Sequence, residues 1–181
     1  MTRAVFLDRD GTLIKDAHYL RDPADIKTIK GVSEALQKIK NAGYLMFMHT
    51  NQSGIARGYY RLEDVHACNQ RMLELYNLNT GFWDGVCIAP EHPEDKELGY
   101  RKPSQKYEFE MVQKYNLNPS LCWMIGDKWI DVETGLKSKM NAALVRTGKQ
   151  ISTETEKLAS SQNVPICEDL SSFCKIHLFQ S

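Results

Sequence analysis

The sequence predicts an α/β protein built on a doubly wound parallel sheet. Short apolar segments alternate along the chain with segments whose apolar residues recur at helical spacing. This alternation is typical of right-handed βαβ units. Polar residues follow directly after several of the apolar segments, as expected where ligands bind at the carboxyl edge of such a sheet. With 181 residues, we expect a single domain over 1–181.

The first predicted elements lie between the N-terminus and the middle of the chain. The apolar run 5–7 reads as a strand, and a polar segment over 15–27 reads as an excursion above the strand ends. Gly31 opens a helix, because apolar residues recur at i, i+3, i+4 and i+7 after it. The continuous apolar runs 44–48 and 84–89 are typical of strands buried on both faces, and a helix over about 62–76 separates them.

The second half continues the same alternation after the longest irregular segment, 90–103. The patterns predict a helix over 104–115, a strand over 121–125, a short helix over 130–138 and a strand over 142–145. The remainder, 152–181, reads as a helix, a short strand near 164–166 and a last helix.

Composition limits the kinds of function. The chain has 23 basic and 23 acidic residues, so its formal net charge is zero, which argues against general binding of nucleic acid or of a membrane surface. No apolar run approaches the roughly 20 residues of a membrane span, and the first strand follows Met1 too closely for a signal peptide. Five scattered cysteines suit reduced thiols. We therefore expect a cytoplasmic protein, a monomer whose partner is a small molecule.

Polar residues just beyond four predicted strands, or in the loops that leave them, form the candidate site. They are Asp8 and Asp10, Thr50 with Asn51, Arg101 with Lys102, and Asp127 with Lys128. Each short motif alone could be a solvated turn, but the carboxyl ends of parallel strands share one edge of the sheet. Segments spread over about 120 residues are therefore expected to converge on one crevice.

These groups suit phosphoryl chemistry. Three acids without His or Cys partners make a hard oxygen site, which Mg²⁺ prefers. The segment 50–53 can donate hydrogen bonds to phosphate, Lys102 adds a point charge, and Arg101 offers a fork for a second anionic group. One Asp can attack phosphorus to give an aspartyl-phosphate, while a second acid moves the proton of the leaving alcohol and of water.

The chain resembles the haloacid-dehalogenase (HAD) superfamily in its four motifs. The matching residues are Asp8-Arg9-Asp10-Gly11-Thr12, Thr50, Lys102, and Gly126-Asp127-Lys128 with Asp131. Within the superfamily, the segments 50–58, 101–103 and 145–149 are similar to the D-glycero-D-manno-heptose-1,7-bisphosphate 7-phosphatases, a branch shared with histidinol-phosphate phosphatases. The likeness runs from about 4 to 149.

The resemblance implies a Rossmann-like HAD core with loop insertions and no large cap domain. Asp8 would be the nucleophile, Asp10 the general acid/base, and Thr50 and Lys102 would stabilise the phosphoryl group. The implied Mg²⁺ ligands are Asp8, Asp10 (through its backbone carbonyl) and Asp127. The implied substrate-binding residues are Asp16, His18, Tyr19, Asn51, Gln52, Ser53, Arg101 and Lys128.

The implied reaction is removal of the 7-phosphate of a heptose bisphosphate, on the route to an activated heptose for lipopolysaccharide. Two alternatives stay open: a phosphatase for histidinol phosphate or another small phosphomonoester, and a non-catalytic phospholigand-binding protein on the same fold. Asp8 and Asp10 together argue against the non-catalytic reading, since a binding protein needs no acid/base.

The loop before Arg101 departs from the branch. Relatives often carry Cys-x-His and Cys-x-Cys there as zinc ligands, whereas this chain has 89–91 as Ala-Pro-Glu and 98–100 as Leu-Gly-Tyr. Two nearby soft residues do not close a tetrahedral site, so no zinc is expected. The loop 90–100 is expected to be held by packing, through Leu98 and Tyr100.

Several single residues could have either a functional or a purely structural role. Asp131 could support the metal or Lys102, or simply favour a helix N-terminus. Trp129 could line the pocket or pack on the sheet. His49 and His66 are each expected in the core or on a helix face. Arg9 is expected to point away from the site, because side chains alternate along an extended chain.

Overall fold

Six parallel strands form one sheet in the computed structural model, which describes residues 2–95, 97 and 99–179. The strands lie in the order β3-β2-β1-β4-β5-β6, which is the doubly wound order. Their bounds are β1 (Ala4–Leu7), β2 (Leu45–Asn51), β3 (Gly85–Ala89), β4 (Trp123–Gly126), β5 (Asn141–Val145) and β6 (Ile166–Cys167). The predicted fold class is confirmed.

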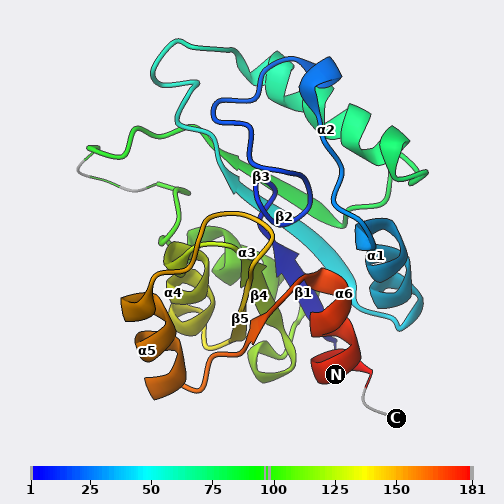
Figure 1. Cartoon of the computed structure of the whole chain (residues 1–181), viewed down its shortest axis with the longest axis vertical. Helices are drawn as coiled ribbons and strands as arrows, with labels where there is room; N and C mark the ends of the chain where they lie inside the picture. The colour runs from blue at the N-terminus through cyan, green and yellow to red at the C-terminus, as the bar shows by residue number, and fades with distance from the viewer. Residues whose placement is uncertain (1, 96, 98, 180–181) are drawn as a thin grey trace.

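Helices cover both faces of the sheet (Figure 1). Buried side chains place α1 (Val32–Asn41), α2 (Leu62–Leu75) and α6 (Leu170–Phe173) on one face, and α6 continues as a π-helical segment (Cys174–Leu178). The other face carries α3 (Lys106–Tyr115), α4 (Trp129–Lys137) and α5 (Thr153–Ser161). No helix among the described residues is both long and apolar enough to cross a membrane.

The central strand β1 is buried on both faces, which explains its continuous apolar sequence. Val5 and Leu7 pack toward α1, whereas Ala4 and Phe6 pack toward α3. Phe6 stacks on Phe47 of β2, with 4.7 Å between ring centroids. The end of β1 is therefore fixed in the middle of the sheet.

Some predicted boundaries were wrong, for local reasons. Strand β4 begins at Trp123 rather than 121, because Pro119–Leu121 forms a 3-10 turn. Strand β2 runs on through its polar residues to Asn51, since Thr50 and Asn51 pair with β3. The last strand is Ile166–Cys167 rather than a segment near 164–166. Trp129 is partly buried and packs against the apolar cluster of α4 and α5, away from the residues that line the pocket described below.

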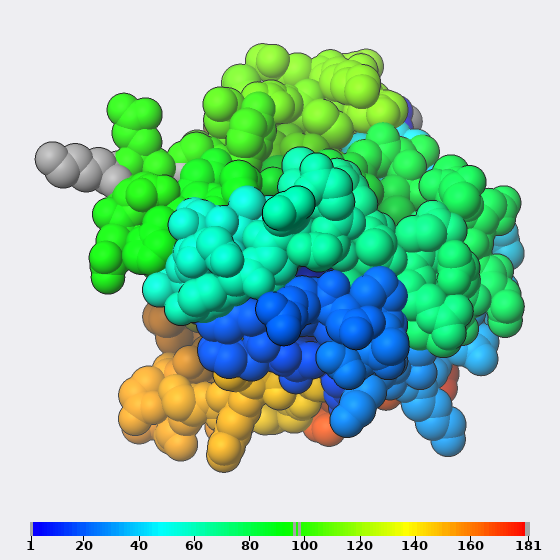
Figure 2. All heavy atoms as spheres, turned by 90° about the horizontal axis from the view of Figure 1, so that it is seen from above, coloured from blue at the N-terminus to red at the C-terminus, as the bar shows by residue number. Residues whose placement is uncertain are grey.

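Three loops leave the carboxyl edge of the sheet: 8–31 after β1, 52–61 after β2, and the described residues 90–95, 97 and 99–105 after β3 (Figure 1). Figure 2, which looks down on this edge, shows the first loop lying against the second. The ring of Tyr19 meets the ring of Tyr59 there, with centroids 4.7 Å apart. Loops, rather than a separate cap domain, cover the edge in the described part of the chain. Leu98, expected to hold the third loop, lies outside the described residues.

Candidate active site

The chain leaves the sheet directly after β1 and forms the floor of a pocket. The Asp8 amide donates to the carbonyl of Ile125, 3.0 Å away, which ties this point to β4. Gly11 has a φ of 94°, and a Cβ there would lie 2.4 Å from a carboxylate oxygen of Asp127. Only glycine fits both the backbone conformation and this close approach. The first motif therefore packs directly on the fourth.

The pocket lies at this edge and has a volume of about 340 Å³. That volume suits a small molecule. The lining residues are Asp8, Arg9, Asp10, Asp16, His18, Tyr19, Leu20, Asn51, Gln52, Ser53, Tyr60, Arg101, Lys102, Lys128, Ile130, Asp131 and Lys149. All eight predicted substrate-binding residues lie in this set. Thr50 and Asp127 are buried just behind it.

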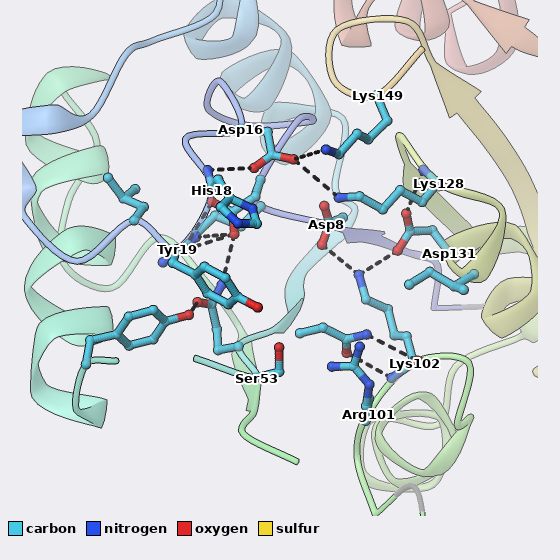
Figure 3. A pocket seen from close by; sticks show the side chains of 17 residues that line it. Asp8, Asp16, His18, Tyr19, Ser53, Arg101, Lys102, Lys128, Asp131 and Lys149 are labelled. Atoms are coloured by element: carbon cyan, nitrogen blue, oxygen red, sulfur yellow. Dashed lines mark hydrogen bonds and ion pairs between the residues drawn. The ribbon is translucent and has the colours of Figure 1, made fainter. Parts of the chain in front are cut away.

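Lys102 is the buried cation at the centre of the site (Figure 3). Its Nζ lies 2.7 Å from Asp8 Oδ1 and 2.6 Å from Asp131 Oδ1. Burial alone would lower the pKa of Lys102, but Asp131 and Asp8 outweigh it and raise that pKa. Lys102 therefore stays protonated while it touches both carboxylates.

Asn51 fixes the backbone that carries Lys102. Its amide oxygen accepts from the Lys102 amide at 2.9 Å, and its amide nitrogen donates to the Lys102 carbonyl at 3.1 Å. Both polar atoms of the side chain are thus engaged by the protein. This gives Asn51 a positioning use that differs from the direct substrate contact we expected.

Asp8, Asp127 and Asp131 could hold a cation, since each offers an oxygen within 4.8 Å of the others. Asp8 Oδ2 and Asp127 Oδ1 are buried and accept no hydrogen bond from the described residues, although Lys128 Nζ lies 3.2 Å from Asp127 Oδ1. Burial first, and then the charge of Asp8, raise the pKa of Asp127 to about 6. Two desolvated carboxylate oxygens without donors fit a hard cation such as Mg²⁺.

Asp131 differs, because both of its oxygens already have donors. Oδ1 accepts from Lys102 Nζ, and Oδ2 accepts from the Lys128 amide at 3.1 Å, at the start of α4. Two of the interpretations that the sequence left open for Asp131 therefore both apply. Asp131 supports Lys102 and caps the helix, and it is less suited than Asp8 and Asp127 to bind a metal.

Arg9 lies against Asp10, so the expectation that it points away was wrong. Its Nε and Nη2 donate to the two oxygens of Asp10, each at 3.1 Å, and its Nη1 donates to Asn69 at 3.0 Å. The alternation argument failed because the extended chain ends at Asp8. The amides of Leu13 and Ile14 turn back to the Arg9 carbonyl.

Gln52 joins Asp10 to the second motif. Its Nε2 donates to Asp10 Oδ2 at 2.9 Å and to Thr50 Oγ1 at 2.8 Å, while Tyr60 donates to its Oε1 at 2.7 Å. Thr50 Oγ1 itself lies 3.5 Å from Asp10 Oδ2. The carboxylate of Asp10 is thus held from several sides. The role of Tyr60 was not predicted, because nothing in its local sequence indicates that its hydroxyl would bond to Gln52.

The mouth of the pocket is rich in cations. Asp16, His18 and Tyr19 lie on one side, and Arg101 with Lys102 on the other, while Lys128 and Lys149 reach toward Asp16 (Figure 3). Asp16 Oδ2 lies 3.9 Å from the Nζ of each of those two lysines. Such an excess of positive charge in a cleft favours an anionic ligand.

Lys149 was missed as a site residue, although it lies in the segment 145–149 that carried part of the resemblance. Its amide donates to Asp127 Oδ2 at 2.7 Å. That contact places its ammonium over the pocket, a consequence of tertiary packing that no local pattern could reveal.

A hydrogen bond from Tyr100 to the carboxylate of Glu91 joins the two ends of the loop before Arg101. Glu91 Oε1 accepts from the Tyr100 amide at 2.7 Å, and the Tyr100 hydroxyl donates to Glu110 Oε1 at 3.0 Å. Tyr100 thus holds this loop as expected, by hydrogen bonds in addition to packing. The absence of zinc stays a prediction.

Comparison with known proteins points to one group. A family model described as HAD-hydrolase-like matches residues 99–173. The D-glycero-beta-D-manno-heptose-1,7-bisphosphate 7-phosphatase of Haemophilus influenzae is 37% identical over 166 residues, covering 88% of this chain and 90% of that protein. The protein of the same name from Haemophilus ducreyi is 38% identical over 167 residues, covering 87% and 90%.

Solved structures show the same fold. The D,D-heptose 1,7-bisphosphate phosphatase of B. bronchiseptica, complexed with magnesium and phosphate, superposes with a TM-score of 0.82 over 97% of both chains, at 23% identity. The D,D-heptose 1,7-bisphosphate phosphatase of Burkholderia thailandensis gives a TM-score of 0.64 over 96% of both chains, also at 23% identity.

Proposed function

This chain belongs to the family of D-glycero-D-manno-heptose-1,7-bisphosphate 7-phosphatases among the HAD-like hydrolases, and on that premise we propose that it removes the 7-phosphate of that sugar bisphosphate. It is a phosphatase of the α/β HAD type. The reaction would be hydrolysis of a phosphomonoester through an aspartyl-phosphate on Asp8.

The observation that carries the proposal is the contact of Lys102 Nζ with Asp8 Oδ1 at 2.7 Å, inside a buried cluster of carboxylates. A cation in this place would orient the carboxylate of Asp8 as a nucleophile. It also lies where negative charge develops on a transferring phosphoryl group. A protein that only binds a phospholigand has no need to align a carboxylate in this way.

Asp8 would attack phosphorus, and Asp10 would donate a proton to the leaving oxygen and later accept one from water. Gln52 and Arg9 would hold Asp10 in place for that exchange. Thr50, behind Asp10, would add a donor for the phosphoryl oxygens. Asp8 and Asp127, with the Asp10 carbonyl, would hold Mg²⁺, which when bound neutralises phosphate charge.

The charges at the mouth favour a substrate with a second phosphate. Arg101, Lys128 and Lys149 lie around the pocket beyond the Asp8–Lys102 pair. They would pair with the phosphate at C1, remote from the bond that breaks. Histidinol phosphate carries an ammonium group instead, which these cations would repel.

Phosphate release from purified protein tests the proposal. Heptose 1,7-bisphosphate and histidinol phosphate would be compared at equal concentrations, with Mg²⁺ and with EDTA. We expect Mg²⁺-dependent release that is at least tenfold faster from the sugar bisphosphate. Faster turnover of histidinol phosphate would overturn the substrate assignment, and full activity in EDTA would overturn the role of the metal.

A further inference from the structure

A buried His–Glu pair under the pocket has no part in the chemistry described above. His49 of β2 and Glu108 of α3 are both fully buried, and His49 Nδ1 lies 2.6 Å from Glu108 Oε1. The other ring nitrogen, Nε2, lies 2.8 Å from the carbonyl oxygen of Tyr100. A carbonyl can only accept, so Nε2 carries a proton and donates it.

The Tyr100 residue is therefore held from both sides of its backbone. Its amide donates to Glu91 Oε1 at 2.7 Å, and its carbonyl accepts from His49. Glu91 is pressed against the chain here, since a Cβ on Gly99 would lie 2.1 Å from Glu91 Oε1. These bonds link β2, α3 and the start of the third loop at one residue.

Arg101 follows directly, and its side chain lines the pocket mouth. Apart from a 3.5 Å contact of Nη1 with the Glu91 carbonyl, no hydrogen bond fixes its guanidinium within the described residues. Lys102 is different, because Asn51 holds both its amide and its carbonyl. The orientation of Arg101 thus depends on the backbone at Tyr100, whereas Lys102 has its own support.

We propose that His49, held by Glu108, and Glu91 are positioning residues that aim Arg101 at the second anionic group of the substrate. This inference rests on the proposed function, because it assigns Arg101 the phosphate remote from the scissile bond. The pair affects recognition and not the phosphoryl chemistry at Asp8. Misplacing a binding group by about an ångström can cost up to about 100-fold in kcat/KM.

The experiment separates recognition from chemistry with two substrates. The sugar bisphosphate has the remote phosphate, and p-nitrophenyl phosphate does not. We expect His49→Leu and Glu91→Ala to raise KM for the bisphosphate at least tenfold, with kcat nearly unchanged. Their kcat/KM for p-nitrophenyl phosphate should stay within threefold of the unmodified enzyme.

Two variants provide controls for folding. Phe47 lies on the same face of β2 as His49, and both rings pack edge-on against Tyr107. Phe47→Leu should therefore lower Tm while leaving the KM for both substrates unchanged. Glu91→Gln keeps an oxygen that can accept from the Tyr100 amide, and should restore KM to within threefold of the unmodified enzyme. In an Arg101→Ala background, His49→Leu and Glu91→Ala should cause no further rise in KM.

Equal losses of kcat/KM on both substrates would overturn the positioning role. So would an equally large rise in KM when His49→Leu or Glu91→Ala is made in the Arg101→Ala background. Inhibition of p-nitrophenyl phosphate hydrolysis by the sugar bisphosphate gives a second measurement, which needs binding but no turnover. An enzyme that binds the bisphosphate without hydrolysing it would overturn the proposed function alone. An inhibition constant that is the same with and without His49→Leu would overturn the inference alone.

Discussion

Replacing Lys102 by Met is expected to damage stability and activity together. The side chain is 1% exposed, and its Nζ touches Asp8 at 2.7 Å and Asp131 at 2.6 Å. Methionine fills a similar volume but leaves both carboxylates without their cation. The change therefore removes the charge while it keeps most of the packing.

The magnitude follows from the burial of both partners. Breaking a buried ion pair by removing one partner costs about 3–5 kcal/mol, and here Asp131 is fully enclosed while Asp8 is nearly so. For a chain of this size that loss corresponds to a fall in Tm of roughly 10 °C. Loss of one preorganised group that stabilises transition-state charge lowers kcat by roughly 100–1,000-fold.

Urea unfolding at pH 7.5 and steady-state phosphate release would measure the two effects. Lys137→Met is the matched control, because its ion pair with Glu133, at 2.8 Å, is solvent-exposed and should contribute less than about 0.5 kcal/mol. Adding Asp131→Asn to Lys102→Met should recover part of the lost stability and none of the lost activity. The central role of Lys102 would be wrong if the free energy of unfolding of Lys102→Met lay within about 1 kcal/mol of that of the unmodified protein and the variant kept a tenth of the activity.

Three further changes probe other parts of the molecule. Asp127→Asn should raise the Mg²⁺ concentration for half-maximal activity by more than tenfold, as read from a metal titration; an unchanged midpoint would exclude this oxygen as a ligand. Arg9→Met should lower kcat by roughly 10–100-fold through misplacement of Asp10 without shifting that midpoint, and a shifted midpoint with normal kcat would contradict it. Burial raises the pKa of each of the five thiols, to about 12 for Cys87 and Cys174. At pH 9 the cysteines should therefore react with a thiol reagent no faster than the protein unfolds. Rapid labelling of the native protein at pH 8 would contradict this. The five cysteines are Cys68, Cys87, Cys122, Cys167 and Cys174.

The fold could be predicted because burial dictates the sequence of its central elements. Strand β1 is apolar without interruption since both of its faces are covered, and α1 shows one apolar face since only that face is covered. Strand β2 was harder to delimit. His49 and Thr50 are buried polar residues inside the strand, and they meet Glu108 and Asp10, which lie far away in the sequence.

The site was predictable where chemistry alone selects the residue type. Asp8 and Asp127 directly follow strands and Lys102 lies in the loop after β3, and the topology brings the three together. The contacts of Arg9 and Lys149 were not predictable in the same way. Each depends on the direction that the chain takes after it has left a strand, which is set by tertiary hydrogen bonds.

The unequal hydrogen bonding of the three buried carboxylates gives them different tasks. Among the described residues, Lys102 contacts Asp8 and Asp131, and the half-buried Lys128 reaches Asp127, so two ammonium groups face three buried carboxylates. Lys102 satisfies Asp131 and one oxygen of Asp8, and the oxygens that lack donors belong to Asp8 and Asp127. A divalent cation held by those two would add positive charge without competing with Lys102. Asp8 would then contact two cations, as suits a nucleophile that attacks a negatively charged phosphate.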